Sequence, residues 1–323
     1  MDNSELINEL ISYSNLVIND TIPITQCVWN SNISKCLHAY DPLSISWVLM
    51  LTISLYSFVF SVVSGNCSKV DQIWSITPEL YGWLFYYLFY TSDVKSTEFN
   101  NKGYILCILI TIWGIRLTYN FWRRGGYGNF FQHEEDYRWP ILRKFINNTF
   151  LFLIFNISFI SFYQNFLLWL LALPIYKVIK SKSEINDYDI CLIVIFLLLL
   201  IFETIADEQH YRFHTYKNSI SIEERLKHKN EDIRNGFYTQ GLFKYCRHPN
   251  YFCEQGIWVT LYLFTVQKNK LYNFTILGSA LLILLFQGSM HFSESITLSK
   301  YKEYSKYKNR TPQCIPFPIN NTK

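Results

Sequence analysis

Long apolar stretches alternate with short polar segments along most of this chain. A helix needs roughly 20 apolar residues to cross a bilayer. The pattern predicts seven crossings, over residues 43–63, 73–90, 104–122, 147–175, 188–206, 255–267 and 271–290. We expect the second to begin near Ile73 and to kink at Pro78, and the fourth to be either one tilted helix or two half-helices. The sequence therefore predicts an all-α, multi-spanning transmembrane bundle of about seven helices over residues 43–318, with a polar segment at 1–42 and a tail at 319–323.

The composition supports a membrane protein. Half of the 323 residues are hydrophobic, and they include 26 Phe, 24 Tyr and 9 Trp, a content too apolar and aromatic for an ordinary soluble domain. A net charge of +4 argues against nucleic-acid binding by bulk electrostatics. The 8 cysteines form no CxxC pair, which argues against a zinc ribbon and a dithiol redox site. Cys27 and Cys36 either pair on a lumenal face or remain free thiols.

The distribution of basic residues predicts the orientation. Lys and Arg are concentrated after the third and fifth expected helices and in the tail, so these regions should be cytosolic. The fourth block must then cross once, and the N-terminus is lumenal, as are the sequons at Asn19 and Asn32. The first apolar helix serves as the insertion signal, because no basic region followed by an apolar core precedes it. Lys177, Lys180 and Lys182 fall on the lumenal side, against the rule.

A polar stretch at residues 245–254 directly precedes the expected helix at 255–267. Polar groups at the mouth of a membrane helix are costly unless they are paired or bind a ligand. If the helix starts near Pro249, Asn250 and Glu254 lie four residues apart on one face. An amide and a carboxylate so placed can hold a carboxamide. The alternative is that Arg247 and His248 are interfacial anchors and that Glu254 pairs with a lysine.

Three polar clusters, at residues 123–138, 207–250 and 294–310, are expected on the same membrane face, where arginines can grip phosphates. Asp207, His210 and His214 share a helical face, which is compatible with a metal site, although no further histidine box follows and interfacial positions account for both histidines. Residues 134–136 are either a solvated charge run or part of a site. Arg116, inside an apolar segment, should face the interior, an aqueous site or a carboxylate such as Asp71.

The stretch GLFKYCRHPNYFCE at residues 241–254 resembles the C-terminal signature of the steroid 5-alpha-reductase-like membrane proteins, and most closely their DUF1295 branch. Further segments resemble that family in the same order, at residues 70–75, 113–120, 135–139, 206–209 and 301–316. The resemblance covers roughly residues 45–318. Cys253 is a departure, since the family often has glycine there, and it can tighten the helix entry.

This resemblance implies an all-helical bundle that binds NADPH from the cytosol and transfers hydride to a carbon–carbon double bond of a steroid, sterol or acyl chain. It places Asn250 and Glu254 near the nicotinamide carboxamide, with Tyr245 and Tyr251 in the same region. The other cofactor-binding positions that it implies are Asp207, Arg212, Arg247 and His248 around the ribose and phosphates, with Glu294 and Tyr301 closing the site from the tail.

Reduction of an alkene also needs a proton donor. Steroid 5-alpha-reductases use a glutamate and a tyrosine from earlier helices, and no motif locates that pair here. We take Asp71 as the candidate acid, with Tyr119 behind it. Arg116, Asp136 and Arg138 are expected to contact the substrate or to support the site.

A second resemblance points to another reaction. Isoprenylcysteine carboxyl methyltransferases carry an Arg-His-Pro-x-Tyr motif, a later glutamate and an Arg-Val-Pro, and there the motif binds S-adenosylmethionine. This chain offers Glu294 and residues 310–312, so the tail does not discriminate. Asn250 with Glu254, Asp71 and residues 135–139 favour the reductase. A catalytically silent membrane protein would lack these polar residues. We expect a protein of the endoplasmic reticulum that contacts membrane lipids and a lipid-like substrate, with no nucleic acid and no obligate protein partner.

Overall fold

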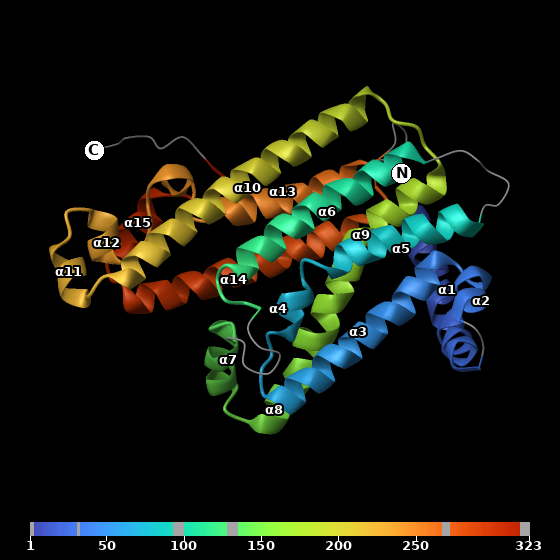
Figure 1. The fold of residues 1–323 in the computed structure, drawn as a ribbon, viewed down its shortest axis with the longest axis horizontal. Helices are drawn as coiled ribbons and strands as arrows, with labels where there is room; N and C mark the ends of the chain where they lie inside the picture. The colour runs from blue at the N-terminus through green and yellow to red at the C-terminus, as the bar shows by residue number, and fades with distance from the viewer. Residues whose placement is uncertain (1–2, 31–32, 93–99, 128–134, 267–271, 317–323) are drawn as a thin grey trace. The chain divides into compact units, whose positions relative to one another are not determined.

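A computed structural model describes residues 3–30, 33–92, 100–127, 135–266 and 272–316 (Figure 1). Within these ranges every regular element is a helix, which confirms the all-α class. The expected tail at 319–323 lies outside the described residues. The chain divides into two compact units: unit 1 comprises Met1–Ile190 and Leu261–Ser279, and unit 2 comprises Cys191–Thr260 and Ala280–Lys323.

The helices of unit 1 come mainly from the first half of the chain. They are α1 (Asn3–Asn30), α2 (Ile33–Ala39), α3 (Pro42–Ser64), α4 (Lys69–Ile73), α5 (Thr77–Ser92), α6 (Asn101–Trp122), α7 (Arg138–Ile146), α8 (Thr149–Phe155), the π-helical segment η1 (Asn156–Tyr163) and α9 (Gln164–Ser181). The helices that lie wholly or mainly in unit 2 are α10 (Asp187–Ser219), α11 (Ile222–Lys227), α12 (Glu231–Asn235), the 3₁₀ segment η2 (Gly241–Lys244), α13 (Pro249–Leu263), α14 (Ile276–Lys300) and α15 (Tyr304–Arg310).

Five helical segments among the described residues are long and apolar enough to cross a bilayer, and the protein is an integral membrane protein. They are 42–64, 101–122, 149–181, 187–219 and 276–300. The other two expected crossings, α5 and α13, have only 16 and 15 helical residues. At 1.5 Å per residue each is shorter than a hydrocarbon core of about 30 Å. The expected count of seven crossings therefore stays a prediction.

The fourth apolar block is one continuous helical segment and not two half-helices. It runs for 33 residues from Thr149 to Ser181 and widens into π-helical turns at η1. Its buried amides bond to α3: the Asn156 side chain donates to Ser61 Oγ at 2.7 Å. These bonds satisfy polar groups that lipid cannot.

The expected kink at Pro78 is wrong. α4 ends at Ile73, and α5 begins as a separate helix at Thr77, so Pro78 occupies the first turn of α5. Proline is tolerated there because the first turn leaves its backbone N–H groups without intrahelical partners in any case.

Contacts at the two ends of unit 1 fix the direction of its helices. At one end, Asn100 beside α6 donates to the Ile179 carbonyl of α9 at 3.1 Å, and Tyr176 donates to Asp41 before α3 at 2.9 Å. At the opposite ends of α3 and α6, the turn between α4 and α5 meets the last part of α6, where the Ser75 and Thr118 hydroxyls lie 2.7 Å apart. Since α3 and α6 run in the same direction, α5 returns along the length of the unit between them (Figure 1).

The polar N-terminal segment is folded onto this first end. Lys177 of α9 pairs with Glu9 of α1 at 2.6 Å, and Ser44 of α3 donates to Asp20 of α1 at 2.6 Å. A disulfide joins Cys27 and Cys36, so of the two alternatives for these cysteines the structure has the pair.

In unit 2, α10 continues beyond the apolar segment that ends at residue 206 and runs through the polar residues to Ser219, which agrees with the expected helical face of Asp207, His210 and His214. α13 packs closely on α10: a Cβ on Gly256 would lie 2.9 Å from Leu199. The tail is bound to the start of α13, since the Arg247 and His248 N–H groups donate to the Pro312 and Gln313 carbonyls at 2.9 and 3.0 Å.

Candidate functional site

The start of α13 positions the first group of site residues. Its first residue is Pro249, whose fixed φ suits the first helical position, so Asn250 and Glu254 lie on one face as the sequence predicted. Asn250 Nδ2 donates to Asp207 Oδ1 of α10 at 3.3 Å. Glu254 Oε1 accepts from Trp258 Nε1 at 2.9 Å. Asp207 and Glu254 are each 5% exposed, so two buried carboxylates belong to this helix mouth.

A buried charge network lies directly before α13 and does not include Asn250. Arg247 Nε and Nη2 donate to the two carboxylate oxygens of Glu294 on α14, at 2.7 and 3.1 Å. Glu294 is 1% exposed and also contacts His248 Nε2 at 3.0 Å and Lys308 Nζ at 3.3 Å. Two cationic side chains and an imidazole thus surround one carboxylate.

The remaining donors of Arg247 hold the tail. Its Nη1 donates to the Lys308 carbonyl at 2.9 Å and to the Thr311 carbonyl. The tail is further fixed where Tyr307 donates to the Phe243 carbonyl at 2.5 Å. Arg247 is therefore a positioning residue in this arrangement, and its expected contact with a cofactor phosphate stays a prediction.

The other expected cofactor residues of unit 2 have distinct surroundings. The Tyr251 ring stacks on His248 and tilts against Phe286, with centroids 5.4 and 4.6 Å away. Tyr245 is exposed. Tyr301 covers Gly236, where a Cβ would lie 2.4 Å from its ring. Arg212 has a side chain that is 79% exposed and pairs with Glu208 on the same helix, so its guanidinium is open to an anion.

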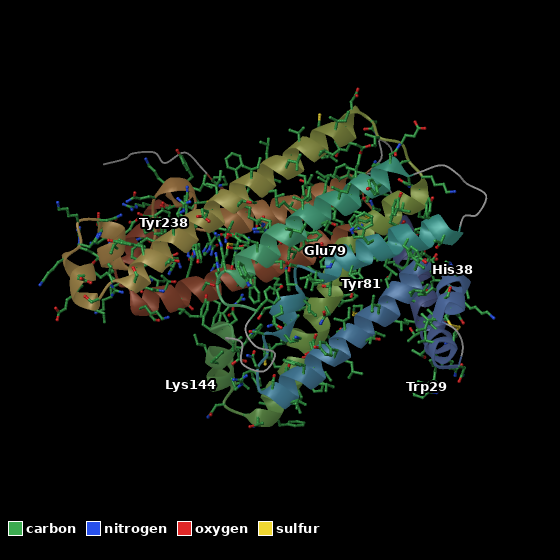
Figure 2. The ribbon with its side chains drawn as sticks, in the orientation of Figure 1. Trp29, His38, Glu79, Tyr81, Lys144 and Tyr238 are labelled. Atoms are coloured by element: carbon green, nitrogen blue, oxygen red, sulfur yellow. A yellow bond between two sulfur atoms is a disulfide. The ribbon has the colours of Figure 1, made fainter. Side chains whose placement is uncertain are left out.

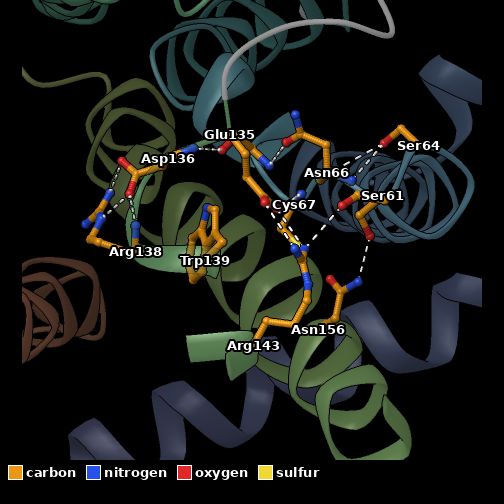
Figure 3. Close-up of polar contacts among 12 residues, drawn as sticks. Ser61, Ser64, Asn66, Cys67, Glu135, Asp136, Arg138, Trp139, Arg143 and Asn156 are labelled. Atoms are coloured by element: carbon orange, nitrogen blue, oxygen red, sulfur yellow. Dashed lines mark hydrogen bonds and ion pairs between the residues drawn. The ribbon is translucent and has the colours of Figure 1, made fainter. Parts of the chain in front are cut away.

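The second group of site residues is in unit 1 and joins segments that are far apart in sequence (Figure 3). Trp139 Nε1 donates to Asp71 Oδ2 at 3.0 Å, and the Asp136 N–H donates to Ser68 Oγ at 2.8 Å. Burial raises the pKa of Asp71 above its ordinary value, while the Arg138 cation and the Trp139 N–H partly oppose this rise. A carboxyl group in such surroundings retains its proton more readily.

The charged residues around Asp71 are paired. Arg138 donates to both Asp136 oxygens, at 2.7 and 3.0 Å. Arg143 donates to both Glu135 oxygens, at 2.8 and 3.2 Å, and Glu135 in turn accepts from the Cys67 N–H at 2.9 Å. Glu135 and Asp136 therefore do not form a solvated charge run; Glu134 lies outside the described residues.

Two expected residues of α6 differ in their surroundings. Arg116 is half-buried and its Nε is enclosed by protein, as expected for a cation inside an apolar segment. Tyr119 is 56% exposed and lies against Trp122 and the Arg123 guanidinium. The structure thus groups Asp71, Asp136 and Arg138 around Trp139, whereas Tyr119 is on an exposed face of its helix.

The sequence interpretation missed two residues of α5 (Figure 2). Glu79 in the first turn approaches Gly114 so closely that a Cβ there would lie 2.9 Å from Glu79 Oε2 and 2.7 Å from the Ser75 carbonyl. Tyr81 is fully buried, and its hydroxyl has no hydrogen-bond partner among the described residues. The available signal was a carboxylate and a phenol at the start of an early helix, next to the motif at 70–75.

The structure adds no further ligand, among the described residues, to the metal site considered for α10. The His210 and His214 rings lie 4.3 Å apart between centroids in a tilted contact on one helical face. Among the described residues no group of three or more His, Cys, Asp or Glu side chains has a metal-binding arrangement.

Comparison with known proteins places both groups of residues inside one family match. The model of the family described as "Protein of unknown function (DUF1295)" matches residues 57–311. The protein "Uncharacterized protein C594.04c" of Schizosaccharomyces pombe is 30% identical over 292 residues, which cover 88% of this chain and 83% of that protein. No solved structure matches the chain.

Proposed function

The chain belongs to the DUF1295 family, and on that premise we propose that it is a membrane NADPH-dependent reductase of a carbon–carbon double bond in a lipid-like substrate, located in the endoplasmic reticulum. The substrate class is a steroid, a sterol or an unsaturated acyl chain. The proposed reaction type comes from the resemblance of this family to the steroid 5-alpha-reductases.

The observation that carries the proposal is the mouth of α13. The Asn250 amide is held by Asp207, on the same helical face as Glu254. A carboxamide presents one acceptor and two donors, which match the Asn250 N–H and the carboxylate oxygens of Asp207 and Glu254. Burial of both carboxylates strengthens such bonds. The donor set therefore fits the nicotinamide end of NADPH.

Arg212 is the residue proposed to bind a phosphate of NADPH. Its exposed guanidinium can bind a phosphate in bidentate fashion. Arg247, His248 and Glu294 order the tail beside this helix mouth, and Tyr301 packs against Gly236 and Phe237. NADPH supplies a hydride when bound. The chain's own residues hold its carboxamide and phosphate groups and exclude water from the mouth of α13.

The proton that completes the reduction is assigned to Asp71. Its raised pKa keeps a proton available nearer to neutral pH, as a general acid requires. The Trp139 N–H fixes its orientation. Glu79 of α5 is a second carboxyl candidate, and the comparison of Asp71→Asn with Glu79→Gln separates the two.

The test is a titration of the purified chain in detergent with NADPH and, separately, with S-adenosylmethionine. We expect saturable NADPH binding, and energy transfer from tryptophan to the bound cofactor measures it. Asn250→Ala and Glu254→Gln should each weaken it about tenfold, the loss of roughly one hydrogen bond to a charged group. Glu223→Gln, on an exposed face of α11, is the matched control. Saturation by S-adenosylmethionine alone would instead favour the methyltransferase.

The proposed orientation places the N-terminus in the lumen and the C-terminus in the cytosol, with seven crossings. The Cys27–Cys36 disulfide supports it, because disulfides persist in oxidising compartments. Lys177 and Lys180 pair with Glu9 and Asp41, so these lumenal lysines are neutralised and oppose the positive-inside rule less than the sequence suggested. Glycosylation at Asn19, on an exposed face of α1, is the expected result. A glycan at Asn147 in its place would overturn the orientation. The second expected sequon, Asn32, lies outside the described residues.

A further inference from the structure

A cavity of about 590 Å³ lies in unit 1, where α6 and α10 begin and where α9 and α13 end. This volume is typical of small-molecule sites. Its wall includes Lys102, Lys177, Asn186, Tyr188 and Phe264. None of the residues assigned above to the nicotinamide, the phosphates or the proton lines it, so an inference from this cavity is independent of the proposed reductase function.

Lys102 is the unusual member of this wall. It lies in the first turn of α6, where the helix dipole disfavours a cation, and it is only 7% exposed. Its partner is Asp189 of α10, at 2.8 Å. A buried ion pair of this kind is seldom more stable than an apolar pair of the same size. Stability therefore does not explain Lys102, and a charged residue in a membrane helix marks a functional site by default.

A second ammonium lines the same cavity. Lys177 pairs with Glu9 at 2.6 Å and keeps a side chain that is 22% exposed. The carboxylate partners of the two lysines, Asp189 and Glu9, are not among the residues that line the cavity. The ammonium groups of α6 and α9 therefore line the cavity as members of ion pairs whose carboxylates lie behind its wall.

Neutral donors and an apolar wall complete the lining. Ser181 and Ser183, whose hydroxyls lie 3.2 Å apart, and Asn186 add donors that suit anionic oxygens. Phe264 and Val266 form the apolar part, and the Phe264 ring lies 6.0 Å from Lys102 Nζ. Two ammonium groups with hydroxyl and amide donors have the chemistry of a phosphate site.

The location of the cavity suggests where that phosphate comes from. Helices α6, α10 and the 149–181 segment are each long enough to cross a bilayer. Their shared end is therefore at the level of the lipid headgroups, where the Lys102 and Lys177 ammonium groups can meet a lipid phosphate. We propose that this cavity binds the phosphate group of an anionic phospholipid, with the headgroup beside Lys102 and Lys177 and the glycerol end against Phe264.

Binding to the full-length chain in detergent, measured by native mass spectrometry, tests this proposal. The probes are phosphatidylglycerol, diacylglycerol without a phosphate, and inorganic phosphate as a competitor. Wild type should bind phosphatidylglycerol and not diacylglycerol. Lys177→Gln and the double variant Lys102→Met/Asp189→Leu should each lower the affinity at least tenfold. Lys144→Gln, an exposed lysine of α7 (Figure 2), should leave it unchanged.

The arms separate the possible results. If millimolar inorganic phosphate displaces phosphatidylglycerol, the cavity binds free phosphate as well as the lipid phosphate. If it does not displace phosphatidylglycerol, the lipid is the ligand. Equal binding of diacylglycerol and phosphatidylglycerol would overturn the proposal, as would unchanged lipid binding in Lys177→Gln. The double variant removes both partners of the buried pair and so leaves no unpaired buried charge. Lys177 is partly exposed, so Lys177→Gln should also fold. NADPH binding in these variants should equal that of wild type, so failure here is distinct from failure of the reductase proposal.

Discussion

Trp139 donates its indole N–H to Asp71 at 3.0 Å, across 68 residues of sequence. The bond joins α4 to the first turn of α7, and it brings together two of the segments that resemble the reductase family. It also holds a carboxyl group whose pKa burial raises. Asp71 is thus both a structural acceptor and the proposed acid.

The raised pKa of Asp71 predicts a pH-dependent stability. Above the ordinary range of an aspartate, near pH 4, the folded chain holds a proton that the unfolded chain has released. The free energy of unfolding therefore falls as pH rises through the folded pKa. Asp71→Asn keeps the acceptor for Trp139 and removes this loss, so the stability difference between variant and wild type should grow with pH. Thermal melts at several pH values measure it, and a parallel pH response in both proteins would contradict the assignment.

Glu294 is predicted to be the most sensitive charged residue of unit 2. Glu294→Gln leaves the buried Arg247 guanidinium without its counter-charge, which should cost about 3 kcal/mol in the free energy of unfolding. The matched control is Glu303→Gln, which breaks the exposed Lys306–Glu303 pair and should not change the melting temperature. Equal melting temperatures for the two variants would show that Glu294 does not hold the tail.

Two cysteines outside the membrane helices are predicted to be unreactive. Burial raises the pKa of Cys67 to about 11 and that of Cys246 to about 12. At pH 7.5 almost none of either thiol is ionised, and the thiolate is the reactive form. Maleimide labelling followed by peptide mass spectrometry should leave both unmodified in the folded chain and modify both after denaturation. Rapid labelling of Cys67 in the native protein would contradict the buried loop around Glu135.

Two glycines of α14 provide a matched pair for helix packing. A Cβ on Gly278 would lie 2.8 Å from the Leu170 backbone, whereas a Cβ on Gly288 would meet nothing within 4 Å. Gly278→Ala should force α9 and α14 apart and lower the melting temperature. Gly288→Ala should be neutral or raise stability by up to about 1 kcal/mol, since alanine favours the helix. The same fall in both variants would indicate a general intolerance of substitution in α14.

The sequence predicted well whatever depends on local composition and period. The apolar blocks gave the all-α membrane class, and Pro249 gave the start of α13 and hence the shared face of Asn250 and Glu254. The same approach was wrong at Pro78, because a proline in a first turn and a proline at a kink have the same local sequence signal. The helical spacing of Asp207, His210 and His214 agrees with a helix that continues past the apolar segment to Ser219.

What the sequence determined by itself is the all-α membrane class, the long apolar segments, and the list of polar residues near them that need an explanation. Only the tertiary structure decided which of these polar residues neutralise one another. Glu135 is paired with Arg143, Arg247 with Glu294, and Lys102 with Asp189. These partners lie 8, 47 and 87 residues apart in the chain. The physical reason is that pairing depends on distances of a few ångströms between side chains, and packing of helices sets those distances, whereas composition and period report only on each helix separately.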